Sequence, residues 1–314
     1  MSWNQADESR YGIHSVDHFA LEVPSLEEGS HFFNAFGLDV RQENDGLALR
    51  ADSQPHVWAR LFAGGQKHLA YLSLSCYREE FDGLCRQAQA AGALPADLSD
   101  RYVNAEGRWF YDPDGNLLQL KVGPKVTPHV MSRSTRHEVR ANERGMGNRS
   151  AAPKTRPRRL SHVMMFTPDV ERAIAFWSTA FGLRLSDRGG EAVAFLHGRH
   201  GSDHHLVALV ASSARGWHHS AWDVDGVDEV GRGGEQMREA GYTEGWGTGR
   251  HVLGSNFFHY VRDPWGSFAE FSADIDYVPM GARWPSAQHP AEDSLYQWGP
   301  PVPDYFISNS EAAD

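Results

Sequence analysis

The sequence has little cysteine, no long apolar run and no excess of positive charge, and each shortage excludes a class of protein. Only Cys76 and Cys85 occur among 314 residues, which is too few for a disulfide framework, and their spacing fits no common zinc pattern. No stretch approaches the ~18 consecutive apolar residues of a membrane span. The net charge of −11 argues against a general nucleic-acid binder. We therefore expect neither a nucleic-acid nor a membrane partner.

The start of the chain and its cysteine content indicate where the protein works. The stretch MSWNQADESRYG has neither a basic segment nor an apolar one, so we expect no secretion signal. Reduced cysteines make the cytoplasm the expected location. What the sequence does contain is 17 His and 10 Trp, which is compatible with metal binding or with a large aromatic core. The positions of the histidines must decide between the two.

An internal repeat divides the chain. Residues 16–40 and 160–185 share the order strand, Pro turn, helix and Phe-Gly-Leu, and each half continues with another His-led strand, 68–75 or 218–224. A second helix and short strands around an Asp-Pro-x-Gly hairpin follow in each half. This order predicts an α+β fold of tandem βαβββ modules, two in each half, with each half forming an open barrel.

Composition predicts the domain boundaries. The segment between the halves carries ten Lys or Arg against two Glu and has no sustained periodicity, which favours a solvated linker over a nucleic-acid arm. The Pro- and Trp-rich stretch after about residue 278 is expected to pack in irregular structure against the second half. We predict an N-terminal domain without metal over 1–123, a basic linker over 124–159, a catalytic domain over 160–290 and a tail over 291–314.

Three potential metal ligands lie on the strands predicted for the second half: His162, His219 and Glu270. Side chains alternate along a strand, so each ligand points to one definite face. If these faces turn inward, two imidazoles and one carboxylate converge, which is the facial triad suited to iron(II). Glu270 lies between Phe268 and the aromatic Phe271, where a carboxylate is costly to bury unless it is paired or bound to a metal.

Two Asp-Pro-x-Gly hairpins, WFYDPDGNLLQL (109–120) and YVRDPWGSFAEF (260–271), can be superposed. A three-residue loop with Gly266 in the left-handed conformation places Tyr260 opposite Glu270. Tyr260 is therefore predicted to share the face of the carboxylate.

The same register gives the first half a different set of residues. Trp109 lies opposite Gln119, and His18 and His68 are assigned to the other two ligand positions. A neutral amide is a poor iron ligand, so we expect the first half to hold no metal. Its histidines are expected to be satisfied by hydrogen bonds.

Two further histidines suit roles beside a metal. His205 lies fourteen residues before His219 and suits an acid–base role. His251 lies nine residues before Tyr260 and suits the role of a substrate hydrogen-bond donor. Adjacent strand residues face opposite ways, so a slip of one residue would exchange His205 with His204. The same slip would exchange the two members of the pair 218–219.

The stretch GRHVLGSNFFHYVRDPWGSFAEF resembles the signature of the type I extradiol ring-cleavage (catechol 2,3-dioxygenase-like) dioxygenases of the vicinal oxygen chelate superfamily. In that signature Gly-Arg-His is followed by Tyr nine residues later and by a Glu ligand ten residues after that. The resemblance extends over most of the chain and weakens in the linker and tail. It implies metal ligands at His162, His219 and Glu270, an acid–base group at His205, and substrate contacts from His251 and Tyr260.

This resemblance also implies an activity. Members of the family bind a catechol and O2 at Fe(2+), with Mn(2+) as a possible alternative, and open the ring beside the diol with both oxygen atoms entering the product. Such enzymes act in the catabolism of aromatic compounds. The sequence is similar in general to enzymes for alkyl-, aryl- or polyhydroxylated aromatics, and we expect a homo-oligomer.

The sequence departs from the family pattern at three positions. Met164 stands where some members have Asn, Gly254 where others have Asp, and Trp246 where some acid-binding members have Arg. These differences concern the substituents of the substrate and argue against simple transfer from an aryl-acetate-cleaving relative.

Two other functions are open at this stage. A glyoxalase-type metal-dependent lyase or isomerase can be built from the same modules, but its usual site carries two Glu, whereas Gln119 stands at the corresponding position here. A metal-free binding protein of the same fold is the other alternative, and in that protein all the histidines would be incidental. Metal content after anaerobic purification separates the last class from both enzymes.

Overall fold

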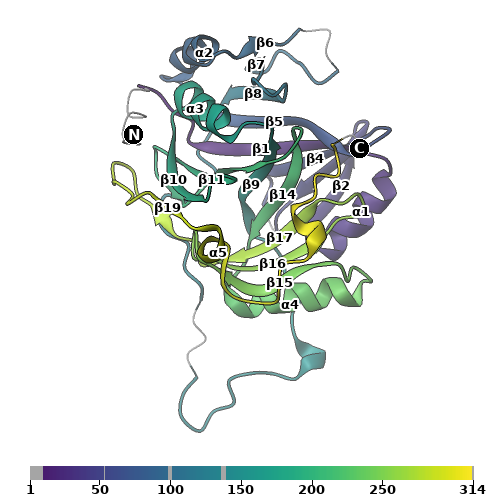
Figure 1. Ribbon diagram of the computed structural model, residues 1–314. Coiled ribbons are helices and arrows are strands. Elements are labelled where there is room, and N and C mark those ends of the chain that lie inside the picture. The colour runs from purple at the N-terminus through teal and green to yellow at the C-terminus, as the bar shows by residue number, and fades with distance from the viewer. Residues whose placement is uncertain (1–9, 53, 98–100, 136–138, 313–314) are drawn as a thin grey trace.

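The computed structural model describes residues 10–312 except 53, 98–100 and 136–138. Residues 1–9, for which the sequence predicts no secretion signal, lie outside the described residues. The chain folds into two large sheets, one from each half (Figure 1). Within the described residues, no helix combines the length and the apolar character needed to cross a bilayer.

The first half forms one eight-stranded sheet with two helices. Its elements are β1 (Ser15–Val23), α1 (Leu26–Ala35), β2 (Asp39–Glu43), β3 (Gly46–Arg50), β4 (Val57–Ala63), β5 (His68–Cys76), α2 (Phe81–Ala90), β6 (Leu94–Pro95), β7 (Arg108–Tyr111) and β8 (Leu117–Val122). The strand order is β2-β3-β4-β1-β5-β8-β7-β6. The two modules therefore meet at the antiparallel pair β1–β5 in the middle of the sheet.

The second half repeats this arrangement. Its elements are β9 (Arg159–Thr167), α3 (Val170–Phe181), β10 (Leu183–Gly189), β11 (Val193–Gly198), β12 (Ser202–Asp203), β13 (Val207–Ala211), β14 (Gly216–Asp223), α4 (Gly226–Glu239), β15 (Gly245–His251), β16 (Phe257–Arg262) and β17 (Phe268–Ala273). The strand order β10-β11-β13-β9-β14-β17-β16-β15 matches that of the first half. The prediction of tandem βαβββ modules is confirmed.

Local sequence signals explain where the helices begin and end. The Ser25 side chain accepts a hydrogen bond from the backbone N–H of Glu28 at the start of α1, and Asp169 accepts one from Arg172 at the start of α3. Such caps satisfy N–H groups that have no partner inside the helix. Gly182 ends α3 in the left-handed conformation, which a residue without a Cβ adopts easily.

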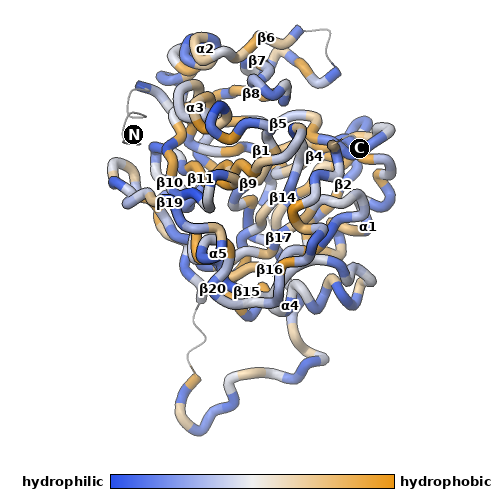
Figure 2. The backbone as a smooth tube through the Cα atoms, viewed as in Figure 1, coloured by the Kyte–Doolittle hydropathy of each residue, from blue (hydrophilic) through white to orange (hydrophobic). Residues whose placement is uncertain are grey.

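One apolar core extends across both halves. Phe19 on β1 lies against Trp217 on β14 with ring centroids 4.6 Å apart, and Phe36, which follows α1, stacks on Phe271 of β17 at 3.8 Å. Apolar residues are concentrated in the strands and helices of the body (Figure 2). The first half is therefore packed directly against the strands that carry the candidate ligands.

The linker leaves the body as a long excursion beyond α4 (Figure 1). Its regular structure in the described residues is one short 3-10 helix, η2 (Arg149–Ala151). Cationic side chains of the linker pair with carboxylates of the second half: Arg149 lies 2.6 Å from Glu235, and Arg158 lies 2.8 Å from Asp223. The positive charge of this segment is thus partly neutralised within the chain.

The tail is more regular than expected. It contributes β18 (Tyr277–Val278), β19 (Ala287–His289), α5 (Ala291–Ser294), β20 (Tyr296–Trp298) and η3 (Asp304–Ile307). β19 extends the second sheet beside β10, and β20 extends it beside β15. Packing against the second half is as predicted, but the expectation of irregular structure throughout is wrong, because both open edges of the sheet offer unpaired backbone groups that the tail can bond.

Candidate metal centre

Strand register brings the three candidate ligands onto one face. Ala221 on β14 lies opposite His162 on β9 and opposite Glu270 on β17, and His219 is two residues away from Ala221 on the same strand. Paired residues, and residues two apart, share a face of a sheet. The small Ala221 side chain leaves the space between His162 and Glu270 open. One donor atom from each of the three ligands lies within 4.8 Å of the other two.

The donor atoms point at one another. Oε2 of Glu270 lies 3.3 Å from Nε2 of His162 and 3.5 Å from Nε2 of His219, and all three residues are at most 2% exposed. Among the described residues, Nε2 of His219 and Oε2 of Glu270 are buried with no hydrogen-bond partner. A buried polar atom without a partner is costly, and a divalent cation would bind both atoms. The donor set therefore fits a metal ion.

Hydrogen bonds fix the tautomer of His219. The carbonyl of Phe306 can only accept, so Nε2 of His218, 2.8 Å away, carries a proton. Burial lowers the pKa of His218 to about 4, so the ring is neutral and its bare Nδ1 accepts from Nδ1–H of His219 at 2.7 Å. Nε2 of His219 therefore carries no proton, and its lone pair points at Glu270.

A strand bulge explains how two adjacent histidines can touch. The β9–β14 register shifts between Trp217 and His219, so His218 is the extra residue. A bulge interrupts the strict alternation of faces. The bulge decides which of the two histidines faces Glu270. His219 does, and His218 lies behind it.

The carboxylate of Glu270 has its own partner. Nδ2 of Asn256 donates to Oε1 of Glu270 at 2.9 Å and also lies 2.9 Å from Oγ of Ser272. The sequence pattern predicts no role for Asn256. It directly precedes β16, fourteen residues before Glu270, and spacing alone does not reveal this contact.

His205 lies beside the ligands and His204 lies behind it. The His205 ring centroid is 4.0 Å from that of His162, whereas Nε2 of His204 is 2.9 Å from a carboxylate oxygen of Asp187. Both histidines precede β13 rather than belonging to it. Burial holds the pKa of His205 well below its usual value, and the neighbouring histidines, His162 above all, lower it further. The ring is therefore neutral.

His251 and Tyr260 are bonded to each other. Nδ1 of His251 donates to the carbonyl of Leu295 at 2.6 Å, so its Nε2 accepts from the hydroxyl of Tyr260 at 2.9 Å. Burial and the charge of Glu270 hold the pKa of Tyr260 well above 10. The hairpin has the expected register, with Tyr260 opposite Glu270 and Gly266 at a φ of +95°.

The first half differs from expectation at one position. Ser73 on β5 lies opposite both His18 and Gln119, as Ala221 does in the second half. Tyr71 lies two residues before Ser73, just as His219 lies two residues before Ala221. The first-half counterpart of His219 is therefore Tyr71, and the assignment of His68 is wrong. The side chain of His68 is 47% exposed at the start of β5.

The first-half residues satisfy one another. Nε2 of His18 lies 3.1 Å from the hydroxyl of Tyr71, and Nδ1 of His18 lies 2.7 Å from Asp17. Oε1 of Gln119 accepts from Ser73 at 2.7 Å. A cavity of about 540 Å³ opens beside these groups. Hydrogen bonds occupy the atoms that would bind a metal, in contrast to the second half.

The three departures from the family pattern lie around the site. Trp246 is buried and stacks on Tyr260 with nearly parallel rings. Gly254 has a φ of +87°, and a Cβ there would lie 3.4 Å from Nδ1 of His204. Met164 packs with Phe166 in an apolar cluster. An aspartate at position 254 would be strained by the positive φ, and its Cβ would contact the histidine pair at ordinary van der Waals distance.

Comparison with known proteins identifies the family. The model described as Glyoxalase/Bleomycin resistance protein/Dioxygenase superfamily matches residues 159–271. The chain is 55% identical to metapyrocatechase 2 from Cupriavidus necator over 303 residues, which is 96% of this chain and 94% of that protein. This chain belongs to the extradiol ring-cleaving dioxygenases. As a member of that family it is an enzyme that uses a catalytic metal.

Two more distant proteins are also similar to this chain. The chain is 24% identical to a manganese-dependent 2,3-dihydroxybiphenyl 1,2-dioxygenase from Geobacillus genomosp. 3, with 92% of this chain and 94% of that protein covered. A solved structure of a homoprotocatechuate 2,3-dioxygenase variant from Brevibacterium fuscum superposes with a TM-score of 0.75 at 21% identity, covering 98% of this chain and 86% of that one. The second likeness shows the vicinal oxygen chelate fold alone.

Proposed function

We propose that this dioxygenase opens the ring of a substituted catechol beside the diol, with O2, at a divalent metal bound by His162, His219 and Glu270. The observation that carries the assignment is the convergence of donor atoms, two of which are buried without any partner in the described chain. Iron(II) is our first choice of metal because two imidazoles and one carboxylate suit it. Manganese(II) accepts the same ligands, and one relative is named for it.

When bound, the metal supplies a Lewis-acidic centre with open positions, at which a diol can chelate and electrons can pass. The protein contributes the orientation of that centre. His218 and Asn256 hold His219 and Glu270 in the geometry described above. Such partners of metal ligands keep the ligand side chains aligned.

His205 is the proposed acid–base group. Its ring is neutral and lies against His162, next to the space that the diol would occupy. Nδ1 of His204 is 3.0 Å from Nδ1 of His205, and Asp187 accepts from the far nitrogen of His204. Since Nε2 of His204 donates to Asp187, its Nδ1 accepts, and His205 donates through Nδ1 and keeps Nε2 free. That nitrogen can take a hydroxyl proton from the catechol and return it as the ring opens.

Tyr260 and His251 are proposed to hold a substrate oxygen. Tyr260 stays protonated at neutral pH because its pKa is raised, so its hydroxyl is a donor. The proton that it now gives to His251 at 2.9 Å can be redirected to a catechol oxygen. His251 is anchored by the Leu295 carbonyl and cannot donate through Nε2 unless it first takes up a proton.

The surroundings of the site favour a ring without a charged substituent. Phe195 lies 4.8 Å from His205 by ring centroids, and the apolar cluster of Met164 and Phe166 adjoins it. Trp246 takes the place of the arginine found in some acid-binding members. These residues support an alkyl-, aryl- or hydroxyl-substituted catechol. A homo-oligomeric state and a cytoplasmic location stay predictions.

The other members of the superfamily are less well supported. A glyoxalase-type site would need a second Glu, and the corresponding first-half residue is Gln119, whose amide oxygen accepts from Ser73 and whose amide nitrogen donates to the carbonyl of Glu106. A metal-free binding protein would not leave buried donor atoms of His219 and Glu270 without partners.

Oxygen uptake by the reconstituted protein tests the function. Chain loaded anaerobically with Fe(II), or in parallel with Mn(II), is offered catechol, alkylcatechols, bicyclic diols, trihydroxybenzenes and catechol acids. Uptake with uncharged catechols and formation of a yellow semialdehyde-type product are expected, with weak uptake for acids. Absence of uptake with every catechol and either metal would contradict the proposal.

A further inference from the structure

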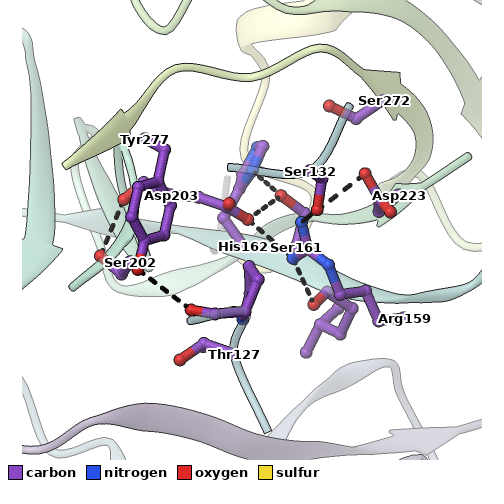
Figure 3. Close-up of polar contacts among 12 residues, drawn as sticks. Thr127, Ser132, Arg159, Ser161, His162, Ser202, Asp203, Asp223, Ser272 and Tyr277 are labelled. Atoms are coloured by element: carbon purple, nitrogen blue, oxygen red, sulfur yellow. Dashed lines mark hydrogen bonds and ion pairs between the residues drawn. The ribbon is translucent and has the colours of Figure 1, made fainter. Parts of the chain in front are cut away.

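Ser161 lies between His162 and a buried carboxylate (Figure 3). Its Oγ is 3.2 Å from Nδ1 of His162 and 3.1 Å from Oδ2 of Asp203. An ionised carboxylate can only accept, so the Ser161 hydroxyl donates to Asp203. The oxygen of Ser161 is then left to accept from Nδ1–H of His162. Nε2 of His162, which faces Glu270, consequently carries a lone pair rather than a proton.

Arg159 pairs with Asp203. Its NH1 lies 2.7 Å from Oδ2 of Asp203, its NH2 lies 3.6 Å from Asp223, and Arg159 is buried with both carboxylates. A guanidinium does not lose its proton in proteins. Burying such a charge cluster costs desolvation, which makes it a weak source of stability. The cluster therefore calls for a role other than holding the fold.

The chain of contacts begins in the linker. NH2 of Arg159 donates to Oγ of Ser132 at 3.1 Å. Ser132 belongs to the segment between the two sheets, so a linker residue is connected through Arg159, Asp203 and Ser161 to a candidate metal ligand (Figure 3). The nearby linker residue Ser134 instead donates to Asp274 and takes no part in this chain.

The first half lacks the relay. There the residue before the histidine is Asp17, whose carboxylate contacts Nδ1 of His18 directly at 2.7 Å. Nε2 of His18 is bonded to Tyr71. A serine placed between carboxylate and imidazole is thus a feature of the half with the convergent donors.

We propose that Ser161, Asp203 and Arg159 are positioning residues that hold His162 in the tautomer and orientation required for metal binding, and that Ser132 ties this relay to the linker. The inference rests on the proposed function, because it requires His162 to be a metal ligand. The relay contacts Nδ1 of His162, the ring nitrogen that does not face Glu270, so it would set how firmly Nε2 holds the metal.

Metal release tests the relay. Protein loaded with Mn(II) is mixed with excess chelator and the rate of Mn(II) loss is measured for wild type, Ser161→Ala, Ser161→Thr and Ser202→Ala. Ser202 is a matched control, since it is buried beside Asp203 but donates to the backbone carbonyl of that residue. We expect Ser161→Ala to release Mn(II) on the order of 10-fold faster, with Ser161→Thr close to wild type because the hydroxyl is kept.

The linker contact is tested in the same assay. Ser132→Ala should release Mn(II) faster than wild type, by a smaller factor than Ser161→Ala, and Ser134→Ala should behave as wild type. The unfolding midpoints of the metal-free Ser161 variants should match that of wild type, which separates positioning from loss of fold.

Two results would overturn the relay: release from Ser161→Ala at the wild-type rate, or equally fast release from Ser202→Ala. A separate variant, Glu270→Gln, reports on the site itself. If that variant held Mn(II) as firmly as wild type, the proposed metal centre would be wrong whatever the serine variants showed.

Discussion

The ring of Phe36 stacks on the ring of Phe271 with centroids 3.8 Å apart and planes 10° from parallel. Phe36 belongs to the first half, and Phe271 follows the candidate ligand Glu270 on β17. The first half, whose described residues form no convergent donor set, therefore supports the strand that carries the carboxylate. This contact gives a physical reason for keeping a second copy of the fold whose own site is closed by hydrogen bonds.

Removing the Phe36 ring should destabilise the whole chain. Phe36 is fully buried, so Phe36→Ala leaves a cavity and should lower the free energy of unfolding by about 3–5 kcal/mol. Urea unfolding of metal-free protein measures the change. Leu94→Ala, at a side chain that is 65% exposed, is the control and should stay within about 0.5 kcal/mol of wild type. An unfolding curve for Phe36→Ala that matches wild type would show that the two halves are not coupled through this contact.

Loss of His205 should slow turnover and leave the metal in place. His205→Phe removes the proposed acid–base group without touching a donor atom, so kcat should fall by about 10²–10⁴ while metal content stays at that of wild type. Steady-state oxygen uptake and metal analysis check the two parts. His204→Phe is the comparison and should have the smaller effect on kcat, since His204 acts only through its neighbour. A defect confined to His204→Phe would reverse the assignment.

The number of metal sites can be changed by design. Glu270→Gln gives the second half the amide of the first and should abolish tight metal binding, so that the wild-type content of about one ion per chain falls to near zero. The reverse change, Tyr71→His with Gln119→Glu, places two imidazoles and a carboxylate at the same strand positions of the first half. This double variant should bind about one additional Mn(II) per chain. Equilibrium dialysis counts the ions, and Gln119→Glu alone is the control. A double variant with no additional ion would mean that register is insufficient to make the site.

Acid should destabilise the fold partly through His14. Burial lowers the pKa of His14 to about 4, against about 6.5 in an unfolded chain, although the carbonyl of Gly123 raises it somewhat. The unfolded state therefore binds more protons between pH 6.5 and 4, and stability falls as the pH is lowered through this window, on the order of 3 kcal/mol for this group. His14→Gln retains a donor for Gly123 and should reduce the loss measured by urea unfolding at pH 7 and pH 4.5. The exposed substitution His31→Gln should leave the difference unchanged, and an equal loss in His14→Gln and wild type would remove His14 from the account.

The hairpin register and the repeat were predictable because both depend on local rules. An Asp-Pro-x-Gly turn fixes which residues face each other, so the Tyr260 and Glu270 pairing followed from the loop length. The assignment of His68 to the second ligand position was wrong because a shared histidine near the start of a strand does not fix the register of that strand. Hydrogen-bond register instead aligns Ser73 with Ala221, and His68 lies at the very start of β5, whereas His219 lies only two residues before Ala221.

The supporting contacts of the site could not be read from spacing. Ser161 is adjacent in sequence to a candidate ligand, yet its partner Asp203 lies 42 residues farther along the chain, on β12, and is brought close only by the fold. Phe306 contributes a backbone carbonyl, and because every residue has one, the sequence does not mark this partner. Contacts of this kind depend on the path of the whole chain, whereas the ligands themselves are marked by residue type and strand position.

The tail supplies two backbone carbonyls that accept hydrogen bonds from histidines of the site. The carbonyl that sets the tautomer of His219 belongs to Phe306, and the one that anchors His251 belongs to Leu295. Both lie beyond the last strand that carries a ligand. A chain cut short after β17 would contain all three candidate ligands and neither carbonyl, so His218 and His251 would lose the partners that orient them. The last residues of the chain thus complete a site whose candidate ligands all lie upstream of them.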